Sequence, residues 1–393
     1  MITDKNFAKE ELLNIRRANL YRALKKVSTI KKMDIRIDGT PAINFCSNDY
    51  LGLSQYPTVL KAARDHLYQI SQCSSRLISG NSPNIDKLER RLAKHRGTES
   101  ALVYPTGYMA NLGVLTVIAD KPSIIYSDEF NHSSIIDGCR LSGATIRVFR
   151  HNNVNDLQQL TDADKYLKSK RKIIITEGIF SMNGDIADLS KICQVARAVN
   201  AITILDDAHG DFILGHSNEY PGTPDLFRVS TNIDVHISSL SKALGCFGGY
   251  VAASHHIREL LINKSRQFIY TSAIPSGLCQ AAIASISVAS KGFLQKKLFR
   301  NIEYFVGVLR KLGLSTSSSV TPIIPIIVRD EKSSVNISNS LLERGVFVQA
   351  IRYPTVMKGG AQLRVSITAM HCRKDLDFAL SSFETTARKY QLI

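Results

Sequence analysis

Two short apolar runs, each followed by reactive side chains, decide the fold. The first is Thr203-Ile204-Leu205, which runs into Asp206-Asp207-Ala208-His209, and the second is Val235-His236-Ile237, which runs into Ser238-Ser239-Leu240-Ser241-Lys242. Helical patterns such as 188–199 separate these runs from similar ones at 101–104, 124–126, 173–176 and 250–253. Strands that alternate with helices predict an α/β fold with a mainly parallel sheet covered on both faces.

The flanking regions have different patterns. Residues 6–27 carry apolar side chains near helical spacing and predict an amphipathic helix. After Pro275 a long helical stretch and a Ser-rich link at 315–319 lead to strand-like runs at 323–328 and 363–367. We therefore expect three parts, which are an N-terminal segment (1–45) that packs with the small domain, a large domain (46–280) and a smaller α+β domain (281–393).

Composition restricts the class of protein. The 393 residues are 44% hydrophobic and 21% charged, and no run reaches the roughly 18 apolar residues of a membrane span. The charged N-terminus lacks the apolar centre of a secretory signal. Seven cysteines without a C-x-x-C pair argue against a disulfide framework or a zinc site, and we expect no metal. A cytoplasmic location is the simplest interpretation.

The net charge of +16 leaves three interpretations open. Nucleic-acid binding is disfavoured, because the basic clusters are not interleaved with aromatic residues. The charge also suits an anionic small molecule or an acidic carrier protein, or it is a solvated surface without any partner.

The residues that follow the predicted strands match the parts of pyridoxal phosphate. In an open α/β sheet, ligands bind beyond the carboxyl ends of the strands. Gly107 opens a helix whose N–H groups suit a phosphate, and Ser239 offers a hydroxyl. Lys242 supplies an amine, and Asp206 could keep the pyridine nitrogen protonated. Asp206, Asp207 and His209 alone could instead form the metal site of a hydrolase. Because both glycine-rich nucleotide motifs are absent, nucleotide-dependent classes lose support.

With these motifs the sequence resembles the α-oxoamine synthases, fold-type I pyridoxal-phosphate enzymes that join an amino acid to an acyl thioester and release CO2. The resemblance extends from Asn44 to about His371. Its motifs are NFCSNDYLGLS (44–54), SSRLISGN (74–81), PTGYMANLG (105–113), SDEFNHSSIIDG (127–138), EGIFSMNGD (177–185), LDDAHG (205–210), SLSKALGCFGG (239–249), YTSAIP (270–275), IRYPTV (351–356) and LRVSITAMH (363–371).

The resemblance implies a role for each matching cofactor residue. Lys242 would hold pyridoxal phosphate covalently and later move the α-proton, and Asp206 would pair with the pyridine nitrogen. His132 would stack on the ring, while His209 and Ser181 would lie near its phenolic oxygen. The phosphate would be held by Gly107, Tyr108, Met109 and Ser239, and by Thr271 and Ser272 of a partner subunit. A homodimer with shared active sites follows.

For the substrates, the resemblance implies that Arg364 and Asn48 bind the amino-acid carboxylate and that Arg22 and Thr355 lie on the substrate side. SSRLISGN and IRYPTV are most similar to the members that condense L-alanine with a pimeloyl thioester in biotin biosynthesis. Members that use glycine or serine are the alternative, and two other classes stay open: an aminotransferase and a non-catalytic partner subunit. Four positions depart from the family pattern and bear on the acyl pocket, namely Cys73, Asp211, Met357 and Gln362.

Overall fold

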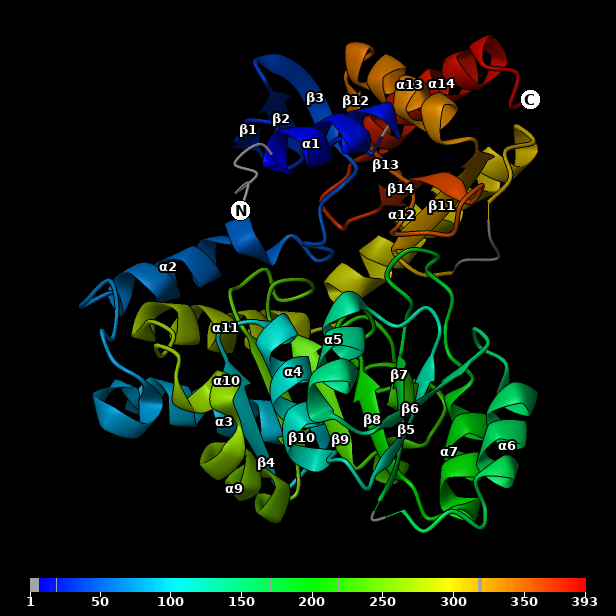
Figure 1. Ribbon diagram of the computed structural model, residues 1–393. Helices are drawn as coiled ribbons and strands as arrows, with labels where there is room; N and C mark the ends of the chain where they lie inside the picture. Colours follow the sequence, from blue (N-terminus) through cyan, green and yellow to red (C-terminus); the bar gives the residue numbers. More distant parts are fainter. Residues whose placement is uncertain (1–6, 19, 170, 218, 317–319) are drawn as a thin grey trace. The chain divides into compact units, whose positions relative to one another are not determined.

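The computed structural model describes residues 7–18, 20–169, 171–217, 219–316 and 320–393 (Figure 1). The chain forms two compact units. Unit 1 comprises 1–47, 182–184 and 298–393, and unit 2 comprises 48–181 and 185–297. The second boundary lies beyond the expected residue 280, because α11 (Ser276–Ala289) packs against α2 (Pro57–Asp65) and α3 (Pro83–Arg96) of unit 2. Residues 317–319 of the Ser-rich link lie outside the described residues.

Unit 2 is built on a seven-stranded sheet in the order β4-β10-β9-β8-β7-β5-β6. β10 is antiparallel to both of its neighbours, and the other six strands run in one direction. The prediction of a mainly parallel α/β sheet is therefore confirmed. The strands are β4 (Ser100–Tyr104), β5 (Ile124–Asp128), β6 (Thr145–Phe149), β7 (Lys172–Glu177), β8 (Ile202–Asp206), β9 (Val235–Ser239) and β10 (Gly249–Ala253).

Helices cover both faces of this sheet (Figure 1). One face packs against α4 (Gly107–Ile118), α5 (Ser133–Ser142), α9 (His255–Lys264) and α10 (Arg266–Ile269). The other face packs against α6 (Val154–Ala163) and α7 (Leu189–Ala198). Alternate residues of one strand serve opposite faces, since Ile173 and Ile175 of β7 join the first core and Ile174 joins the second. A short helix, α8 (Thr223–Leu226), follows β8.

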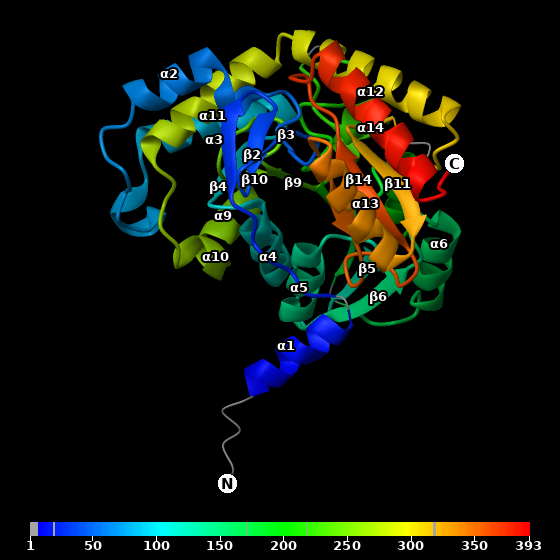
Figure 2. The same cartoon turned by 90° about the horizontal axis from the view of Figure 1, so that it is seen from above.

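Unit 1 contains two smaller sheets, and the N-terminal segment contributes to the first. That sheet has the order β1-β2-β3-β12, in which β12 of the C-terminal part is parallel to β3. The second sheet is antiparallel, in the order β11-β14-β13. α12 and α14 pack beside each other through Phe305 and Phe383 (Figure 2). The elements are α1 (Phe7–Arg17), β1 (Val27–Lys31), β2 (Asp34–Ile37), β3 (Thr40–Asn44), α12 (Phe293–Lys311), β11 (Ile323–Arg329), α13 (Glu331–Glu343), β12 (Val346–Phe347), β13 (Gln349–Ile351), β14 (Ala361–Ser366) and α14 (Arg373–Lys389).

The N-terminal helix is shorter than the prediction of 6–27, which was wrong beyond Arg17. Residues 27–31 form β1 instead, which pairs with β2 in an antiparallel hairpin. The β-branched side chains of Val27, Thr29 and Ile30 favour an extended backbone, and the hairpin supplies its hydrogen bonds.

Among the described residues, no single helix combines the length and apolar composition of a membrane span. Only α11 and α12 taken together reach that composition, and they meet at an angle of 70°.

Candidate active site

Several predicted cofactor residues of unit 2 lie at the carboxyl edge of its sheet. Asp206 ends β8, Glu177 ends the neighbouring β7, and Lys242 lies in the loop between β9 and β10. Glu177 and Asp206 are direct partners in the β7–β8 ladder. Asp206 and Lys242 both act on the pKa values of His132 and Glu177, so these four side chains form one electrostatic cluster.

Asp206 is buried and held by two hydrogen bonds. Its Oδ1 accepts from the backbone N–H of Ala208 at 3.0 Å, and its Oδ2 accepts from Asn111 Nδ2 at 2.6 Å. Asn111 comes from α4, and the same amide nitrogen donates to Ser134 Oγ at 2.9 Å. These bonds fix the carboxylate in one orientation. Asn111 was missed at the sequence level, although a polar side chain in the otherwise apolar helix 107–118 signals a buried partner.

His132 continues this hydrogen-bond chain. Its Nδ1 lies 2.7 Å from Ser134 Oγ and accepts from the backbone N–H of Ser134 at 3.2 Å. The surrounding protein desolvates the ring and lowers its pKa, while Asp206 raises it and Lys242 lowers it further. His132 is therefore neutral near pH 7, with Nδ1 as the acceptor and the proton on Nε2. The ring of Tyr108 meets it edge-on, with the centroids 6.3 Å apart.

Glu177 is a buried carboxyl that the sequence interpretation did not place in a role. Burial raises its pKa well above the ordinary value, and Asp206 raises it further, against the opposing effect of Lys242. Its Oε1 is buried without a hydrogen-bond partner among the described residues. The raised pKa of Glu177 has a physical cause, because two adjacent buried carboxylates cannot both ionise cheaply.

His209 is held by a contact with Tyr50, which lies in the motif at 44–54. The hydroxyl of Tyr50 lies 2.7 Å from His209 Nδ1 and donates to Asn48 Oδ1 at 3.2 Å. Tyr50 and His209 are both buried, and Ser181 is buried at the end of the neighbouring loop. Tyr50 therefore joins two residues that were predicted to serve the cofactor and the substrate. Nothing in the sequence singled out this tyrosine.

The start of α4 forms a close-packed cradle with Ser239 and Gly249. Thr106 caps the helix, and its hydroxyl accepts from the backbone N–H of Met109 at 3.1 Å. A Cβ added to Gly249 would collide with the backbone of Gly107, and one added to Gly107 would lie 3.4 Å from Ser239 Cβ. The first N–H groups of a helix have no partner within it, so this opening suits a phosphate. The N–H groups that open α4 and the hydroxyl of Ser239 fit the phosphate of pyridoxal phosphate.

Thr271 and Ser272 lie on a different part of unit 2. Ser272 bridges to Ser75, and the N–H of Ala273 donates to the carbonyl of Ser74 at 2.9 Å. Large apolar side chains nearby in sequence are exposed: Leu77 by 49%, Ile78 by 82% and Tyr270 by 73%. Thr271 and Ser272 are the residues that were predicted to reach the phosphate of a partner subunit.

The predicted substrate residues Arg22, Thr355 and Arg364 belong to unit 1. Arg364 lies on β14, is only 8% exposed, and donates to Ser366 Oγ at 3.0 Å. Arg22 is exposed and donates to Thr355 Oγ1 at 3.4 Å. Gln362 is one of the four positions that depart from the family pattern. Its side-chain amide donates to the backbone carbonyl of Met182 at 2.9 Å, so it has a structural partner.

A buried ionic network explains the unusual Asp211. Arg96 pairs with Asp207 at 3.0 Å and with Asp211 at 3.1 Å, and His95 reaches Asp211 at 2.9 Å. The hydroxyl of Tyr250 also donates to Asp211. Burial raises the pKa of Asp207 to about 6, whereas that of Asp211 is held below its ordinary value by Arg96 and His95 against the effect of burial. Asp207 is thus engaged with a cation of the protein, which weakens the metal-hydrolase alternative.

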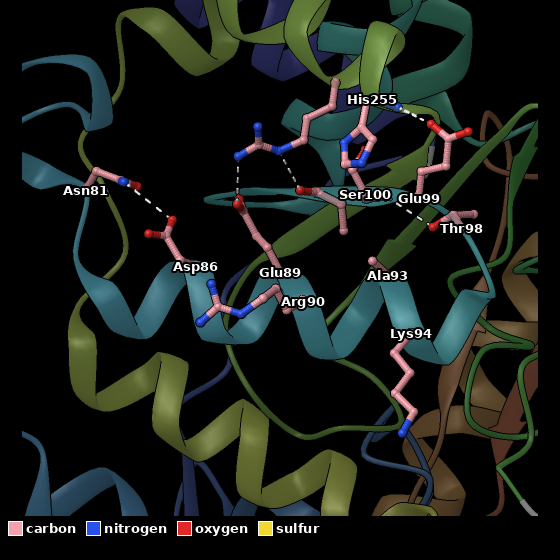
Figure 3. Close-up of a pocket in the computed structure, with 12 residues that line it drawn as sticks. Asn81, Asp86, Glu89, Arg90, Ala93, Lys94, Thr98, Glu99, Ser100 and His255 are labelled. Atoms are coloured by element: carbon pink, nitrogen blue, oxygen red, sulfur yellow. Dashed lines mark hydrogen bonds and ion pairs between the residues drawn. The ribbon is translucent and has the colours of Figure 1, made fainter.

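A pocket of about 620 Å³ lies at the opposite edge of the sheet, where β4 begins (Figure 3). Its walls carry both signs of charge, including Asp86, Arg90 and His255, and Arg258 pairs with Glu89 across it at 3.3 Å. None of the predicted cofactor or substrate residues lines it. Asp206 and Lys242 lie at the carboxyl edge of the sheet and not in this opening.

Comparison with known proteins shows the family of the chain. The family model "Aminotransferase class I and II" matches residues 40–383. The 8-amino-7-oxononanoate synthase of Thermoanaerobacter pseudethanolicus is 40% identical, and the alignment covers 100% of this chain and 99% of that protein. 8-Amino-7-oxononanoate synthase 1 of Bacillus subtilis is 36% identical over 100% of both chains. The chain belongs to the α-oxoamine synthase family.

Solved structures of this family have the same fold. A serine palmitoyltransferase from S. paucimobilis, with a bound PLP–myriocin aldimine, superposes with a TM-score of 0.93 at 26% identity over 100% of both chains. The 8-amino-7-oxononanoate synthase of Francisella tularensis superposes with a TM-score of 0.77 at 27% identity, covering 90% of this chain and 99% of that one. The predicted fold type, family and cofactor are confirmed: the chain is a pyridoxal-phosphate-dependent acyltransferase of the α-oxoamine synthase family.

Proposed function

We propose that this enzyme condenses L-alanine with a pimeloyl thioester, giving 8-amino-7-oxononanoate, CO2 and free thiol in biotin biosynthesis. The observation that carries the proposal is the full-length match, at 36–40% identity, to relatives named 8-amino-7-oxononanoate synthase. The serine palmitoyltransferase has the higher TM-score but only 26% identity. Shape is shared across the family, so sequence identity is the better guide to the substrate.

The residues at the carboxyl edge support the cofactor roles. When bound, pyridoxal phosphate acts as an electron sink for a carbanion at the amino-acid Cα. Lys242 would hold it covalently and later carry the α-proton. Asp206, oriented by Asn111, would keep the pyridine nitrogen protonated. Glu177, whose pKa burial and Asp206 raise, lies beside Asp206 at the end of the neighbouring strand.

The remaining site residues would orient the cofactor and the amino acid. His132 would cover one face of the ring as a neutral imidazole, and Ser181 and His209 would face the phenolic oxygen. Arg364 suits the amino-acid carboxylate, because its planar fork can bind two oxygens at once. Asn48, joined to His209 through Tyr50, would assist it.

Charge supports an anionic acyl donor. Unit 1 carries 23 Lys and Arg against 12 Asp and Glu, so it holds most of the net charge of +16 although it is the smaller unit. Arg22 and Thr355 lie in this unit. A thioester of coenzyme A or of an acyl carrier protein is anionic in either case and would be attracted by this surface.

We also propose that the enzyme is a homodimer in the cytoplasm, in which Thr271 and Ser272 reach the phosphate of the partner subunit. The exposed Leu77, Ile78 and Tyr270 support this, because monomers rarely leave large apolar side chains clustered in water. Seven cysteines without a disulfide among the described residues suit a reducing compartment.

The proposed reaction is tested by measuring CO2 and free thiol together. Alanine, glycine and serine are each offered with thioesters of several chain lengths, pimeloyl included. We expect alanine with the pimeloyl thioester to give the highest kcat/KM and equal amounts of CO2 and thiol. A preference for glycine or serine would place the enzyme in another branch of the family. Amino-group transfer without thiol release would indicate an aminotransferase, and no turnover with any pair would favour a non-catalytic subunit.

A further inference from the structure

A cluster centred on His151 lies where β6 ends, and it has no role in the proposed reaction. His151 follows β6 and precedes α6, so it comes from the edge of the sheet. Its Nδ1 lies 3.0 Å from Asp128 Oδ1, and its Nε2 lies 2.8 Å from Asp185 Oδ2. Asp128 ends β5, and Asp185 lies in the loop that follows β7. One ring thus joins the end of β5, the segment after β6 and the loop after β7.

The geometry fixes the charge of this ring. Each ring nitrogen faces a carboxylate oxygen, and an ionised carboxylate can only accept a hydrogen bond. A neutral imidazole has one N–H and could satisfy only one of the two, so the ring carries both protons and a positive charge. Burial alone would lower the pKa of His151, but the hydrogen bonds to Asp128 and Asp185 raise it to about 9. Phe130 stacks on the ring with centroids 4.3 Å apart.

Asp128 and Asp185 each bind the backbone of a loop that carries a predicted cofactor residue, Asp128 through its carboxylate and Asp185 through its backbone carbonyl. Asp128 also accepts from the backbone N–H groups of Phe130 and Asn152, both at 2.8 Å, and the carbonyl of Asp128 accepts from the N–H of Asn131. His132 is the next residue. In the other loop the N–H of Phe180 donates to the carbonyl of Asp185 at 3.0 Å, and Ser181 is again the next residue.

We propose that His151 is a positioning residue that, as an imidazolium between Asp128 and Asp185, fixes the loop of His132 relative to the loop of Ser181. This inference rests on the proposed function, since it takes both residues as cofactor contacts. Without the charge, the group between the two carboxylates could donate to only one of them, their mutual repulsion would be uncompensated, and both loops would loosen. Glu129, which accepts from the N–H of His151, adds a third negative group to the cluster.

The test compares His151→Gln, which is neutral, with His151→Arg, whose planar cation can donate to two carboxylates. His66→Gln is the control, because the His66 ring bonds the carbonyl of Ala62, one turn earlier in α2, at 3.0 Å and lies in neither loop. Amide hydrogen exchange is followed by mass spectrometry in the cofactor-free protein, and the Kd for pyridoxal phosphate is then measured. Neither measurement uses an amino acid or a thioester, so a failed condensation assay leaves this test unaffected.

We expect His151→Gln to accelerate exchange in 129–132 and 179–186 by roughly tenfold or more, and to raise the Kd by a similar factor. His151→Arg should restore most of the slow exchange and most of the affinity for pyridoxal phosphate. His66→Gln should change neither the exchange rate nor the Kd. Unchanged exchange in the two loops, a uniform acceleration across unit 2, or equal losses in the Gln and Arg variants would overturn the proposal. If His151→Gln does not fold, Asp185→Asn removes the charge from the other side, and unchanged exchange in 179–186 would equally overturn it.

Discussion

Asp206 has both carboxylate oxygens engaged by the protein, through Asn111 and the N–H of Ala208. Asp206→Asn keeps the shape of the side chain and one oxygen acceptor, but it removes the negative charge. We expect turnover to fall by roughly 10²–10³, because a neutral amide cannot keep the pyridine nitrogen protonated. The Kd for pyridoxal phosphate should change little, since the phosphate cradle is intact. Asp234→Asn, an exposed carboxylate that binds the N–H of Thr203, is the control. Near wild-type turnover in Asp206→Asn would remove this role.

Arg364 offers a second test at the same scale. Arg364→Lys keeps the charge but replaces a planar fork by a point charge, so a carboxylate loses a two-point contact. We expect the apparent affinity for alanine to fall roughly ten- to a hundredfold, which corresponds to about 1.5–3 kcal/mol. The measurement is a titration of the cofactor absorbance with alanine. Arg329→Lys, an exposed arginine of the adjacent β11, should leave the titration unchanged. Equal affinities in Arg364→Lys and wild type would mean that the carboxylate binds elsewhere.

The residues at the carboxyl edge of the sheet were easier to predict from the sequence than the residues that hold them in place. Asp206 and Lys242 follow apolar runs, and strand ends in an α/β sheet converge whatever the details of packing. Asn111 could have been found, since an amide inside an apolar helix needs a partner. Tyr50 and Asn48 could not be linked to His209, because a contact across about 160 residues depends on the tertiary fold.

At the scale of elements, β10 meets the start of α4 at Gly249, where the backbone of Gly107 leaves no room for a side chain. Gly249→Ala should push the start of α4 away from β10, weaken binding of pyridoxal phosphate about tenfold and destabilise the fold by about 1–3 kcal/mol. Gly307→Ala in α12 is the matched control, because its added Cβ meets nothing within 4 Å. It should stabilise by up to about 1 kcal/mol. Melting curves and cofactor titrations of both variants test this, and unchanged cofactor binding in Gly249→Ala would contradict it.

Periodicity predicted most elements of unit 2 but failed where pairing overrides local preference. The strands ending at Asp206 and Ser239 are buried on both faces and read as apolar runs. β6 (Thr145–Phe149) is an edge strand with mixed burial, and its pattern was too weak to predict. The antiparallel direction of β10 could not be read from its sequence, because an apolar run has no direction.

For the whole molecule, the charge of His151 makes stability depend on pH. Its pKa is about 9 when folded, above the ordinary 6.5. A raised pKa means that the stabilisation is complete below pH 6.5 and is lost as the pH rises through 9. We expect a loss of roughly 2–3 kcal/mol between pH 7 and 10. The chain has no tryptophan, so circular dichroism of the cofactor-free protein should follow unfolding.

The control for this pH effect is His151→Gln. Buried thiols such as Cys139, whose pKa burial raises to about 12, also reduce stability above pH 9, so the difference between the two proteins is the relevant quantity. That difference should shrink as the pH rises from 7 to 10. A constant difference would show that His151 does not titrate in this range.

The attachment of the cofactor tests the account most directly. The protein loaded with pyridoxal phosphate is reduced with borohydride, digested and mapped by mass spectrometry, with Lys242→Ala treated in parallel. We predict one modified peptide in the wild type, carrying the cofactor on Lys242, and none in the variant, which should still bind the cofactor reversibly through the cradle of Gly107 and Ser239. A cofactor found on another lysine, or a reducible adduct that persists in Lys242→Ala, would contradict the account.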